Sequence, residues 1–347
     1  MSQRIAVIGA GSWGTALARL LAQKHSQVSL WVRQASLADA MRASRKNSVY
    51  LPEALLPETL DITSDLKAAT AGAAVLVLVV PSHAMRGIAE QLAGSISPSA
   101  TLLSCAKGFE NGTNLRMSEV LASVFPDNPI AVLSGPNHAE EVALDYPTAT
   151  VIASQDEATS RQLQQLFATP FFRPYTNHDV VGVELAGALK NIIALGTGIV
   201  DGLGYGDNTT AALMTRGLAE IARLGMMMGA EAQTFAGLAG VGDLIATCTS
   251  RHSRNRRAGQ ALAKGRTREQ IEQESNMVVE GFRATRAAWE LAQKLQVRMP
   301  IAEQLYGVLF ANQSPWQATT ALMTRENTAE REETLFAQAN WMEKKRL

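Results

Sequence analysis

The sequence predicts an α/β domain with a doubly wound sheet, followed by an all-helical domain. In the first half of the chain, short β-rich runs alternate with helical stretches, which is the pattern of successive βαβ units. After Asp179 this alternation stops, and apolar residues recur at helical spacing. Because 347 residues exceed one ordinary domain, we expect two domains, at 1–179 and 180–347, with a charged tail from about residue 329 that frays.

The strands of the first domain are predicted from runs of aliphatic and β-branched residues. Val75–Val80 is the central strand, because an unbroken aliphatic run indicates burial on both faces of a sheet. The other strands are predicted at Ile5–Ile8, Val28–Val32, Asp61–Thr63, Thr101–Ser104, Ile130–Ser134, Thr148–Ala153 and Phe171–Tyr175. The last two flank a helix at Glu157–Phe167, and we expect them to extend the sheet at its edge.

The second domain shows helical patterns only. A long helix is predicted from Val180 to Val200, where apolar residues recur at helical spacing. Further helices are predicted at Thr209–Gly225, Arg254–Lys264, Arg268–Glu274, Ala284–Lys294 and Ile301–Phe310.

Composition and charge disfavour several classes of protein. The 32 Lys and Arg residues balance 32 Asp and Glu residues, and a zero net charge argues against broad binding to nucleic acid or to a membrane surface. The two cysteines, Cys105 and Cys248, give no disulfide framework and suit a reducing cytosol. The first strand begins too close to Met1 for a signal peptide, and Val75–Val80 is too short to span a membrane. We therefore expect a cytoplasmic protein without membrane insertion.

A glycine-rich segment, Gly9-Ala10-Gly11-Ser12-Trp13-Gly14, separates the first strand from a helical pattern. This strand–turn–helix order is typical of a site for a dinucleotide pyrophosphate. Gly9 permits the tight turn, Gly11 lets the backbone approach the phosphates, and Gly14 allows the helix to pack close to the strand. The helix N-terminus then presents free N–H groups and a positive dipole end. The alternative is a chance glycine turn, and the context favours a cofactor site in a Rossmann-type domain.

Arg33 follows the second predicted strand. Enzymes that select an unphosphorylated dinucleotide usually place Asp or Glu near this position to hold the ribose 2′-OH, whereas an arginine accommodates a 2′-phosphate. A solvated arginine at a strand end is the alternative. The phosphate interpretation predicts that NADP(H) is accepted.

Three more segments follow predicted strands, and the carboxyl ends of strands in an open α/β sheet face the ligand. They are Pro81-Ser82-His83, Cys105-Ala106-Lys107-Gly108 and Gly135-Pro136-Asn137-His138-Ala139. Lys107 is well placed there to meet an anionic substrate. An ordinary surface lysine is an equally good interpretation of Lys107 alone.

Lys190 and Asn191 interrupt an otherwise apolar helical pattern, with the small residues Gly187 and Ala194 at helical spacing from them. Burial of a lysine lowers its pKa, and a general base near neutral pH requires a lowered pKa. The alternative is a lysine that extends its ammonium group to solvent at the rim of the helix. We favour Lys190 as the base.

Polar residues at two predicted helix starts point to substrate binding. Asp243 is interpreted as a helix cap, as a group that holds a substrate hydroxyl or orients Lys190, or as both. Ser253 is predicted to cap the next helix, with Arg254 and Asn255 in its first turn. Cations there oppose the helix dipole unless an anion binds, so this turn suits a phosphate group.

Together these segments resemble bacterial NAD(P)-dependent glycerol-3-phosphate dehydrogenases over nearly the whole chain. The resemblance rests on the order and separation of ten blocks, namely Gly9–Gly14, Pro81–His83, Lys107-Gly108, Ser134–Pro136, Leu189–Ala194, Thr215–Leu218, Gly242–Leu244, Thr247–Thr249, Ser253–Arg256 and Val278–Gly281. It implies a C-terminal domain like that of 6-phosphogluconate dehydrogenase, NADP or NAD as cofactor, and reversible reduction of dihydroxyacetone phosphate to sn-glycerol 3-phosphate for phospholipid synthesis. A homodimer is expected from the family alone.

The resemblance also implies residue roles. Lys190 is the expected proton acceptor. The expected substrate-binding residues are Lys107, Gly135, Asn137, Asp243, Ser253, Arg254 and Asn255. The expected cofactor-binding residues are Gly9, Gly11, Ser12, Trp13, Gly14, Arg33, Lys107, Ala139, Arg254, Val278 and Glu280. The chain departs from the family pattern at Asn137-His138, where the family more often has Ser or Thr followed by Phe, and at Glu140, where it often has Lys.

Two other functions remain open from the sequence. One is a related dehydrogenase for another small hydroxy acid, with a substrate like 6-phosphogluconate or ketopantoate. The other is a regulatory protein that binds NADPH without turnover, although such a protein has no need for a buried lysine or for an anion site in the second domain.

Overall fold

The computed structural model describes residues 3–251, 253–274, 279–327 and 329–330. The chain divides into unit 1, Met1–Glu110 with Leu115–Val180, and unit 2, Asn111–Asn114 with Val181–Leu347. The short segment Asn111–Asn114 interrupts the predicted first domain and packs with unit 2, where Asn114 Nδ2 donates a hydrogen bond of 2.7 Å to Glu290 Oε2. Most of the tail that was expected to fray lies outside the described residues.

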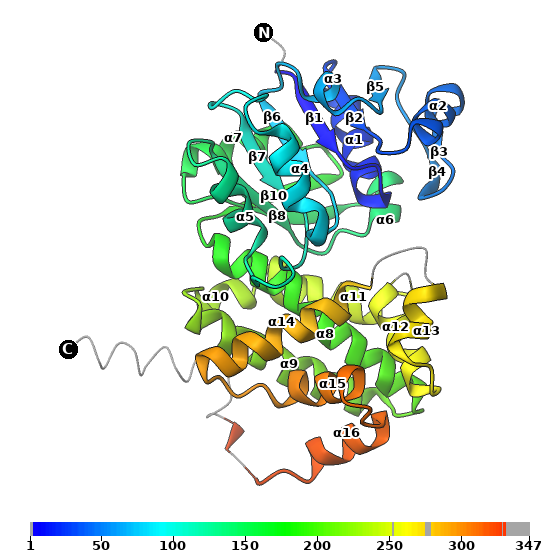
Figure 1. The fold of residues 1–347 in the computed structure, drawn as a ribbon, viewed down its shortest axis with the longest axis vertical. Coiled ribbons are helices and arrows are strands. Elements are labelled where there is room, and N and C mark those ends of the chain that lie inside the picture. The colour runs from blue at the N-terminus through cyan, green and yellow to red at the C-terminus, as the bar shows by residue number, and fades with distance from the viewer. Residues whose placement is uncertain (1–2, 252, 275–278, 328, 331–347) are drawn as a thin grey trace, which may run out of the picture. The chain divides into compact units, whose positions relative to one another are not determined.

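Unit 1 is built on an eight-stranded sheet with the order β10-β9-β8-β7-β6-β1-β2-β5 (Figure 1). Its strands are β1 (Ile5–Ile8), β2 (Val28–Trp31), β5 (Leu60–Thr63), β6 (Val75–Leu78), β7 (Thr101–Ser104), β8 (Ile130–Ser134), β9 (Thr148–Ala153) and β10 (Phe172–Asn177). All neighbouring pairs are parallel except β8 and β9, which are antiparallel. The predicted extension of the sheet by its last two strands is confirmed.

The antiparallel pairing of β8 with β9 was not predicted. A parallel connection needs a crossover long enough to return to the other end of the sheet, and that crossover is usually a helix. Between β8 and β9 the chain forms only the five-residue helix α6 (Ala139–Ala143), so β9 runs back beside β8. The eleven-residue helix α7 (Glu157–Phe167) then returns the chain far enough for β10 to pair parallel to β9.

Helices cover both faces of this sheet, which confirms the doubly wound α/β prediction. One core cluster joins the strands to α1 (Ser12–Lys24), α2 (Ala35–Ser44), α6 and α7. The other core cluster joins them to α3 (Leu66–Thr70), α4 (Met85–Leu92) and α5 (Met117–Val124). Along β1, Ile5 and Val7 belong to the first cluster, whereas Ala6 and Ile8 belong to the second, as the two-residue period of a strand requires.

A second sheet is a short hairpin that the sequence patterns did not predict. It pairs β3 (Lys46–Asn47) antiparallel with β4 (Leu51–Leu55), between α2 and β5. Strand β3 has only two residues, both polar, and so short a strand shows almost no periodic pattern of apolar residues. The hairpin was therefore not predicted from the sequence. One residue of this hairpin, Asn47, forms a hydrogen bond with the glycine-rich turn.

The described part of unit 2 is helical. Its elements are α8 (Val180–Gly202), α9 (Asp207–Met227), α10 (Ala232–Phe235), a π-helical turn (Leu238–Gly242), α11 (Asp243–Thr249), α12 (Arg254–Ala263), α13 (Arg268–Glu274), α14 (Glu280–Leu295), α15 (Pro300–Phe310) and α16 (Pro315–Met323). Helix α8 is long and apolar enough to cross a membrane, but 94% of its most apolar window is buried inside the protein. This burial is typical of the central helix of a helical domain.

Glycines let α8 and α12 approach closely, and this contact fixes the position of the first turn of α12. A Cβ atom on Gly198 of α8 would lie 1.9 Å from the Arg256 carbonyl oxygen, and one on Gly259 of α12 would lie 2.0 Å from the Leu195 carbonyl oxygen. Any larger residue at either position would push the two backbones apart. The ion pair between Arg256 Nε and Asp201 Oδ2, at 2.6 Å, joins the same two helices.

A buried carboxylate holds the start of α15 in unit 2. Glu220 of α9 accepts hydrogen bonds from the backbone N–H groups of Ile301, at 2.8 Å, and Ala302, at 3.3 Å. Burial raises the pKa of Glu220 from 4.5 to about 7, although these hydrogen bonds and the charges of Arg223 and Arg325 act in the opposite direction. The folded protein therefore binds the proton of the Glu220 carboxyl group more tightly than the unfolded chain does. As a result, the contribution of Glu220 to the free energy of unfolding falls as the pH rises from 4.5 to about 7.

We predict that Glu220→Gln removes this pH dependence. Relative to wild type, the free energy of unfolding of the variant should rise by about 2 to 3 kcal/mol between about pH 5 and about pH 8. Urea unfolding at both pH values measures the difference. Glu303→Gln, which changes an exposed carboxylate on α15, is the matched control and should leave the wild-type pH dependence intact. An equal pH dependence in wild type and Glu220→Gln would contradict the assignment.

Candidate functional site

The glycine-rich turn has the backbone geometry that a dinucleotide requires. Gly9 has φ +113°, and a Cβ atom there would lie 2.6 Å from the Val79 carbonyl oxygen. A Cβ atom on Gly14 would lie 1.8 Å from the Gly9 carbonyl oxygen, so only glycine allows α1 to start against this turn. Gly11 differs, because its Cβ direction meets no atom within 4 Å. The turn therefore leaves open space beside Gly11 at the N-terminus of α1, and it fits a pyrophosphate group.

Ser12 and Trp13 open α1 directly after this turn. Ser12 Oγ donates a hydrogen bond of 2.7 Å to the Tyr50 carbonyl oxygen in the segment between β3 and β4. Because its hydroxyl proton is used in this way, we expect Ser12 to contact a phosphate through its backbone N–H. Trp13 packs against the core, and its indole Nε1 is buried without a hydrogen-bond partner among the described residues.

Arg33 lies two residues beyond β2 and is exposed. Within the described part of the chain, its guanidinium group forms no hydrogen bond or ion pair. If Arg33 binds the 2′-phosphate of NADP(H), its guanidinium group must be available for that contact, and the arrangement at this strand end meets this requirement.

Lys107, Gly135 and Asn137 lie together at the carboxyl ends of β7 and β8. Lys107 Nζ donates hydrogen bonds to the Gly135 carbonyl oxygen, at 3.0 Å, and to Asn137 Oδ1, at 3.2 Å. Asn137 Nδ2 donates to Thr150 Oγ1 at 2.9 Å, which orients its oxygen toward the lysine. The departure from the family pattern at Asn137 therefore keeps a polar partner for Lys107. Ala139 begins α6, and its side chain is buried in the core of unit 1.

In unit 2, Lys190 is buried and ion-paired. Only 6% of the residue is exposed, which contradicts the alternative of a lysine that reaches solvent at the helix rim. Lys190 Nζ forms an ion pair with Asp243 Oδ1 and donates a hydrogen bond of 2.6 Å to Thr247 Oγ1. Asp243 and Thr247 are four residues apart and therefore share one face of α11.

The interpretation of Asp243 as a helix cap is wrong. Gly242 occupies the N-cap position of α11, where no side chain forms a capping hydrogen bond. Asp243 is the first residue of the helix itself. The π-helical turn Leu238–Gly242 precedes it, and such turns often occur at functional sites. The other interpretation agrees with the structure, since Asp243 contacts Lys190. Thr247 was not predicted as a partner of this pair, because a threonine within a helix has no distinctive sequence signal.

The first turn of α12 lies beside the Lys190 segment. Asn255 Nδ2 donates a hydrogen bond of 2.8 Å to Asn191 Oδ1, and Gly281 N–H donates one of 2.9 Å to Asn255 Oδ1. The Asn255 side chain thus connects α8, α12 and the start of α14, and its role here is to fix their spacing. The expected contact of Asn255 with the substrate stays a prediction.

Ser253 and Arg254 complete this turn. Ser253 caps α12, as predicted, with Oγ accepting a hydrogen bond of 3.3 Å from Arg256 N–H. Arg254 is exposed, and within the described residues its guanidinium forms no hydrogen bond or ion pair. An uncommitted arginine and the N–H groups of a ten-residue helix make this turn suitable for a phosphate.

Glu280 begins α14, one residue before the glycine that contacts Asn255, so it lies close to the α12 turn. Val278, the other residue predicted near it for cofactor binding, lies outside the described residues.

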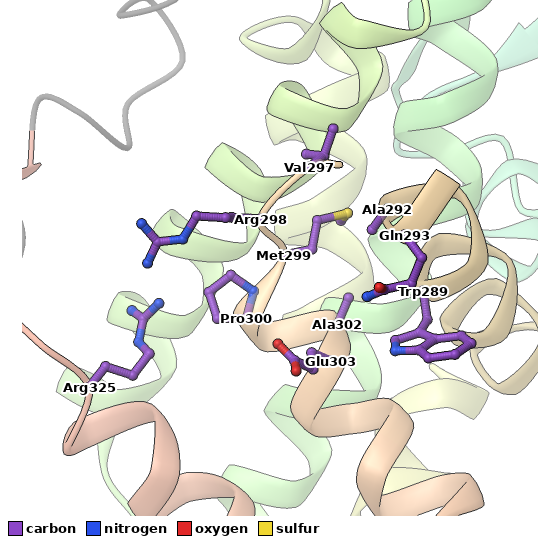
Figure 2. Close-up of a pocket in the computed structure, with 10 residues that line it drawn as sticks. All are labelled: Trp289, Ala292, Gln293, Val297, Arg298, Met299, Pro300, Ala302, Glu303 and Arg325. Atoms are coloured by element: carbon purple, nitrogen blue, oxygen red, sulfur yellow. The ribbon is translucent and has the colours of Figure 1, made fainter. Parts of the chain in front are cut away.

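A separate cavity in unit 2 contains none of these residues. It has a volume of about 290 Å³ and is lined by α14, α15 and the loop between them, with the side chains of Arg298, Glu303 and Arg325 around it (Figure 2). The lining of this cavity includes neither Lys190 nor any residue of the Ser253–Asn255 turn, so it is distinct from the Lys190 region of the same unit.

Thiol and metal chemistry have no support among the described residues. Burial raises the pKa of the Cys248 thiol to about 12, and it also raises the pKa of the Cys105 thiol, so both stay protonated near neutral pH. Within the described ranges, no group of three His, Cys, Asp or Glu side chains is placed to hold a metal ion.

Comparison with known proteins covers both units of the chain. Residues 4–160 match the family described as NAD-dependent glycerol-3-phosphate dehydrogenase N-terminus, and residues 179–320 match the corresponding C-terminus. The chain belongs to this family. The resemblance predicted from the sequence blocks is thereby confirmed, as is the pairing of a Rossmann-type domain with a helical domain.

Relatives match over almost the full length. A glycerol-3-phosphate dehydrogenase (NAD(P)+) of Pelotomaculum thermopropionicum is 54% identical over 98% of this chain and 98% of its own. One of Geobacter sulfurreducens is 51% identical over 95% of this chain and 100% of its own. The solved structure of a glycerol-3-phosphate dehydrogenase from Coxiella burnetii has a TM-score of 0.89 at 41% identity, covering 93% of this chain and 99% of that one.

Proposed function

We propose that the protein interconverts dihydroxyacetone phosphate and sn-glycerol 3-phosphate with NAD(P)H or NAD(P)+. The observation that carries this proposal is the arrangement in unit 2, where a buried lysine ion-paired to Asp243 lies one residue from the asparagine that bonds to the Ser253–Asn255 turn. This arrangement supports the proposal because it would hold a proton-transferring lysine and a phosphate-sized anion site at a fixed spacing. Membership of the glycerol-3-phosphate dehydrogenase family favours this reaction over the related hydroxy-acid substrates.

The substrate phosphate is proposed to bind at the N-terminus of α12. Ser253 caps that helix, and the exposed Arg254 supplies a cation with no competing partner among the described residues. Asn255 keeps the turn in place through its bonds to Asn191 and Gly281. A phosphate group here would offset the unfavourable placement of an arginine at the positive end of the helix dipole.

Lys190 is proposed to exchange a proton with the C2 oxygen of the substrate. A neighbouring carboxylate favours the charged ammonium, whereas burial favours the neutral amine. In the reductive direction the ammonium of Lys190 donates its proton to the C2 oxygen as negative charge develops there, and in the oxidative direction the amine accepts it. Asp243 and Thr247 orient the nitrogen. The nicotinamide, when bound, supplies or accepts the hydride.

Lys107 is proposed to add positive potential at the substrate from unit 1. Its contacts with Gly135 and Asn137 hold the ammonium group at the carboxyl ends of the strands. A fixed cation near a developing alkoxide stabilises the transition state more than a solvated one does.

Arg33 is proposed to bind the 2′-phosphate of NADPH. We predict that Arg33→Ala raises KM for NADPH about tenfold or more, because one charge-assisted phosphate contact is worth about 1.5–3 kcal/mol. KM for NADH, which lacks this phosphate, should change less than about twofold and serves as the internal control. Steady-state kinetics with both cofactors measures the two values. Equal increases for NADPH and NADH would contradict the assignment.

The direct test of the proposed function is NADPH oxidation by the purified protein with and without dihydroxyacetone phosphate. Oxidation that depends on this substrate supports the proposal. Oxidation only with other ketoacids, such as ketopantoate, would favour a related dehydrogenase, and NADPH binding without turnover of any carbonyl substrate would favour a regulatory protein.

We also propose that the product feeds phospholipid synthesis in the cytoplasm, and that the enzyme is a homodimer. Both proposals rest on the family resemblance. Light scattering of the purified protein tests the dimer, and a requirement for added glycerol 3-phosphate after gene deletion tests the metabolic role.

A further inference from the structure

A buried asparagine outside the glycine-rich segment holds that segment in place. Asn47 belongs to β3 of the short hairpin and has 0% exposure. Its Nδ2 donates one hydrogen bond of 2.9 Å to the Ala10 carbonyl oxygen and another of 2.8 Å to Thr15 Oγ1. A single side chain therefore connects the middle of the turn to the first turn of α1.

The bond to Ala10 fixes the orientation of a peptide group. In a trans peptide the C=O and the following N–H point in opposite directions, and the described chain has no cis peptide bond. Because the Ala10 carbonyl points at Asn47, the N–H of Gly11 points away from it. Among the described residues this N–H has no hydrogen-bond partner, and the space beside Gly11 is open.

The same asparagine ties the hairpin to the turn from the other side. Asn47 Oδ1 accepts a hydrogen bond of 3.2 Å from Tyr50 N–H, and the Tyr50 carbonyl accepts the bond from Ser12 Oγ. The segment between β3 and β4 is thus attached to both the turn and the start of α1. All of these groups lie in unit 1.

We propose that Asn47 is a positioning residue for cofactor binding, which keeps the Ala10–Gly11 peptide in the orientation that presents the Gly11 N–H to the dinucleotide pyrophosphate. If this peptide rotated, the Ala10 carbonyl oxygen would face the phosphate oxygens, and a hydrogen-bond donor would be replaced by a repulsive acceptor. The inference rests on the binding of NAD(P)H and not on the identity of the carbonyl substrate.

The test compares ligands with and without a pyrophosphate. ADP-ribose carries the group and adenosine carries no phosphate, so calorimetric Kd values for both separate the turn from the adenosine site. We expect Asn47→Ala to raise Kd for ADP-ribose and for NADPH about tenfold or more, from the loss of one charge-assisted contact. Kd for adenosine, kcat at saturating NADPH and KM for dihydroxyacetone phosphate should change less than about twofold.

A matched control exists in the same unit. Asn128 Nδ2 also donates to two backbone oxygens, those of Ser97 at 2.9 Å and Ala100 at 2.8 Å, before the start of β8. Asn128→Ala removes bonds of the same kind away from the glycine-rich turn, and we expect it to leave Kd for ADP-ribose unchanged. A general loss of rigidity would instead affect both variants.

A second variant keeps the proposal testable if Asn47→Ala does not fold. Asn47→Leu keeps roughly the volume of the asparagine side chain and places no charge in the core, but it loses both donors, so it should bind ADP-ribose about as weakly as Asn47→Ala. Wild-type Kd for ADP-ribose in a folded Asn47 variant, or equal losses for ADP-ribose and adenosine, would overturn the proposal. Wild-type protein that binds NADPH but fails to reduce dihydroxyacetone phosphate would refute the proposed reaction and leave this inference intact.

Discussion

Lys190→Met is expected to lower kcat by roughly 10²- to 10⁴-fold, the range typical for loss of a general acid–base group. Methionine is an unbranched side chain only one atom shorter than lysine, but it cannot exchange a proton with the C2 oxygen of the substrate. Kd for NADPH should stay within about twofold of wild type, because the glycine-rich turn and Arg33 are unchanged. Single-turnover kinetics and cofactor fluorescence measure the two quantities separately.

The buried carboxylate complicates this experiment, and a second variant resolves it. Without Lys190, the buried Asp243 carboxylate loses its ion-pair partner, and breaking a buried ion pair in this way destabilises a protein by about 3–5 kcal/mol. The double variant Lys190→Met with Asp243→Asn removes this charge, so it should be more stable than the single variant and equally inactive. Near-wild-type turnover by either folded variant would remove Lys190 from the proton-transfer step.

Arg254→Ala is expected to raise KM for dihydroxyacetone phosphate about 10- to 100-fold. The reason is the loss of a charge-assisted contact with the phosphate, worth about 1.5–3 kcal/mol. KM for dihydroxyacetone, which has no phosphate, should change little. The comparison of the two substrates therefore isolates the phosphate site.

Arg257 provides the matched control for Arg254. It lies on the same helix, is exposed, and forms no hydrogen bond or ion pair within the described residues. Arg257→Ala removes the same charge three residues further along α12 and should leave KM for dihydroxyacetone phosphate within about twofold of wild type. Equal effects of the two substitutions, or equal effects of Arg254→Ala on both substrates, would contradict the anion site.

Much of the fold was predictable because its signals are local and periodic. The aliphatic runs gave β1, β7, β8 and β9 with the bounds that the structure has. The glycine-rich turn was recognisable because Gly9 and Gly14 are places where any side chain would collide with the backbone. Lys190 was recognisable because a charged residue stood inside an apolar helical pattern.

The unpredicted features depend on contacts between distant segments. Asn47 is one polar residue in a hairpin too short to show a period, and its role appears only when its partners Ala10 and Thr15 are known. The partners of Lys190 lie more than 50 residues further along the chain. Spacing alone likewise gave no reason to expect that Asn255 would bond to Asn191 and Gly281.

A crystal structure of the protein with sn-glycerol 3-phosphate and NADP+ tests the central assignment most directly. We predict that the phosphate lies against Ser253, Arg254 and the N-terminus of α12, with the C2 oxygen about 3 Å from Lys190 Nζ. A glycerol phosphate bound in clear density with its C2 oxygen remote from Lys190, or with its phosphate away from this turn, would contradict the assignment.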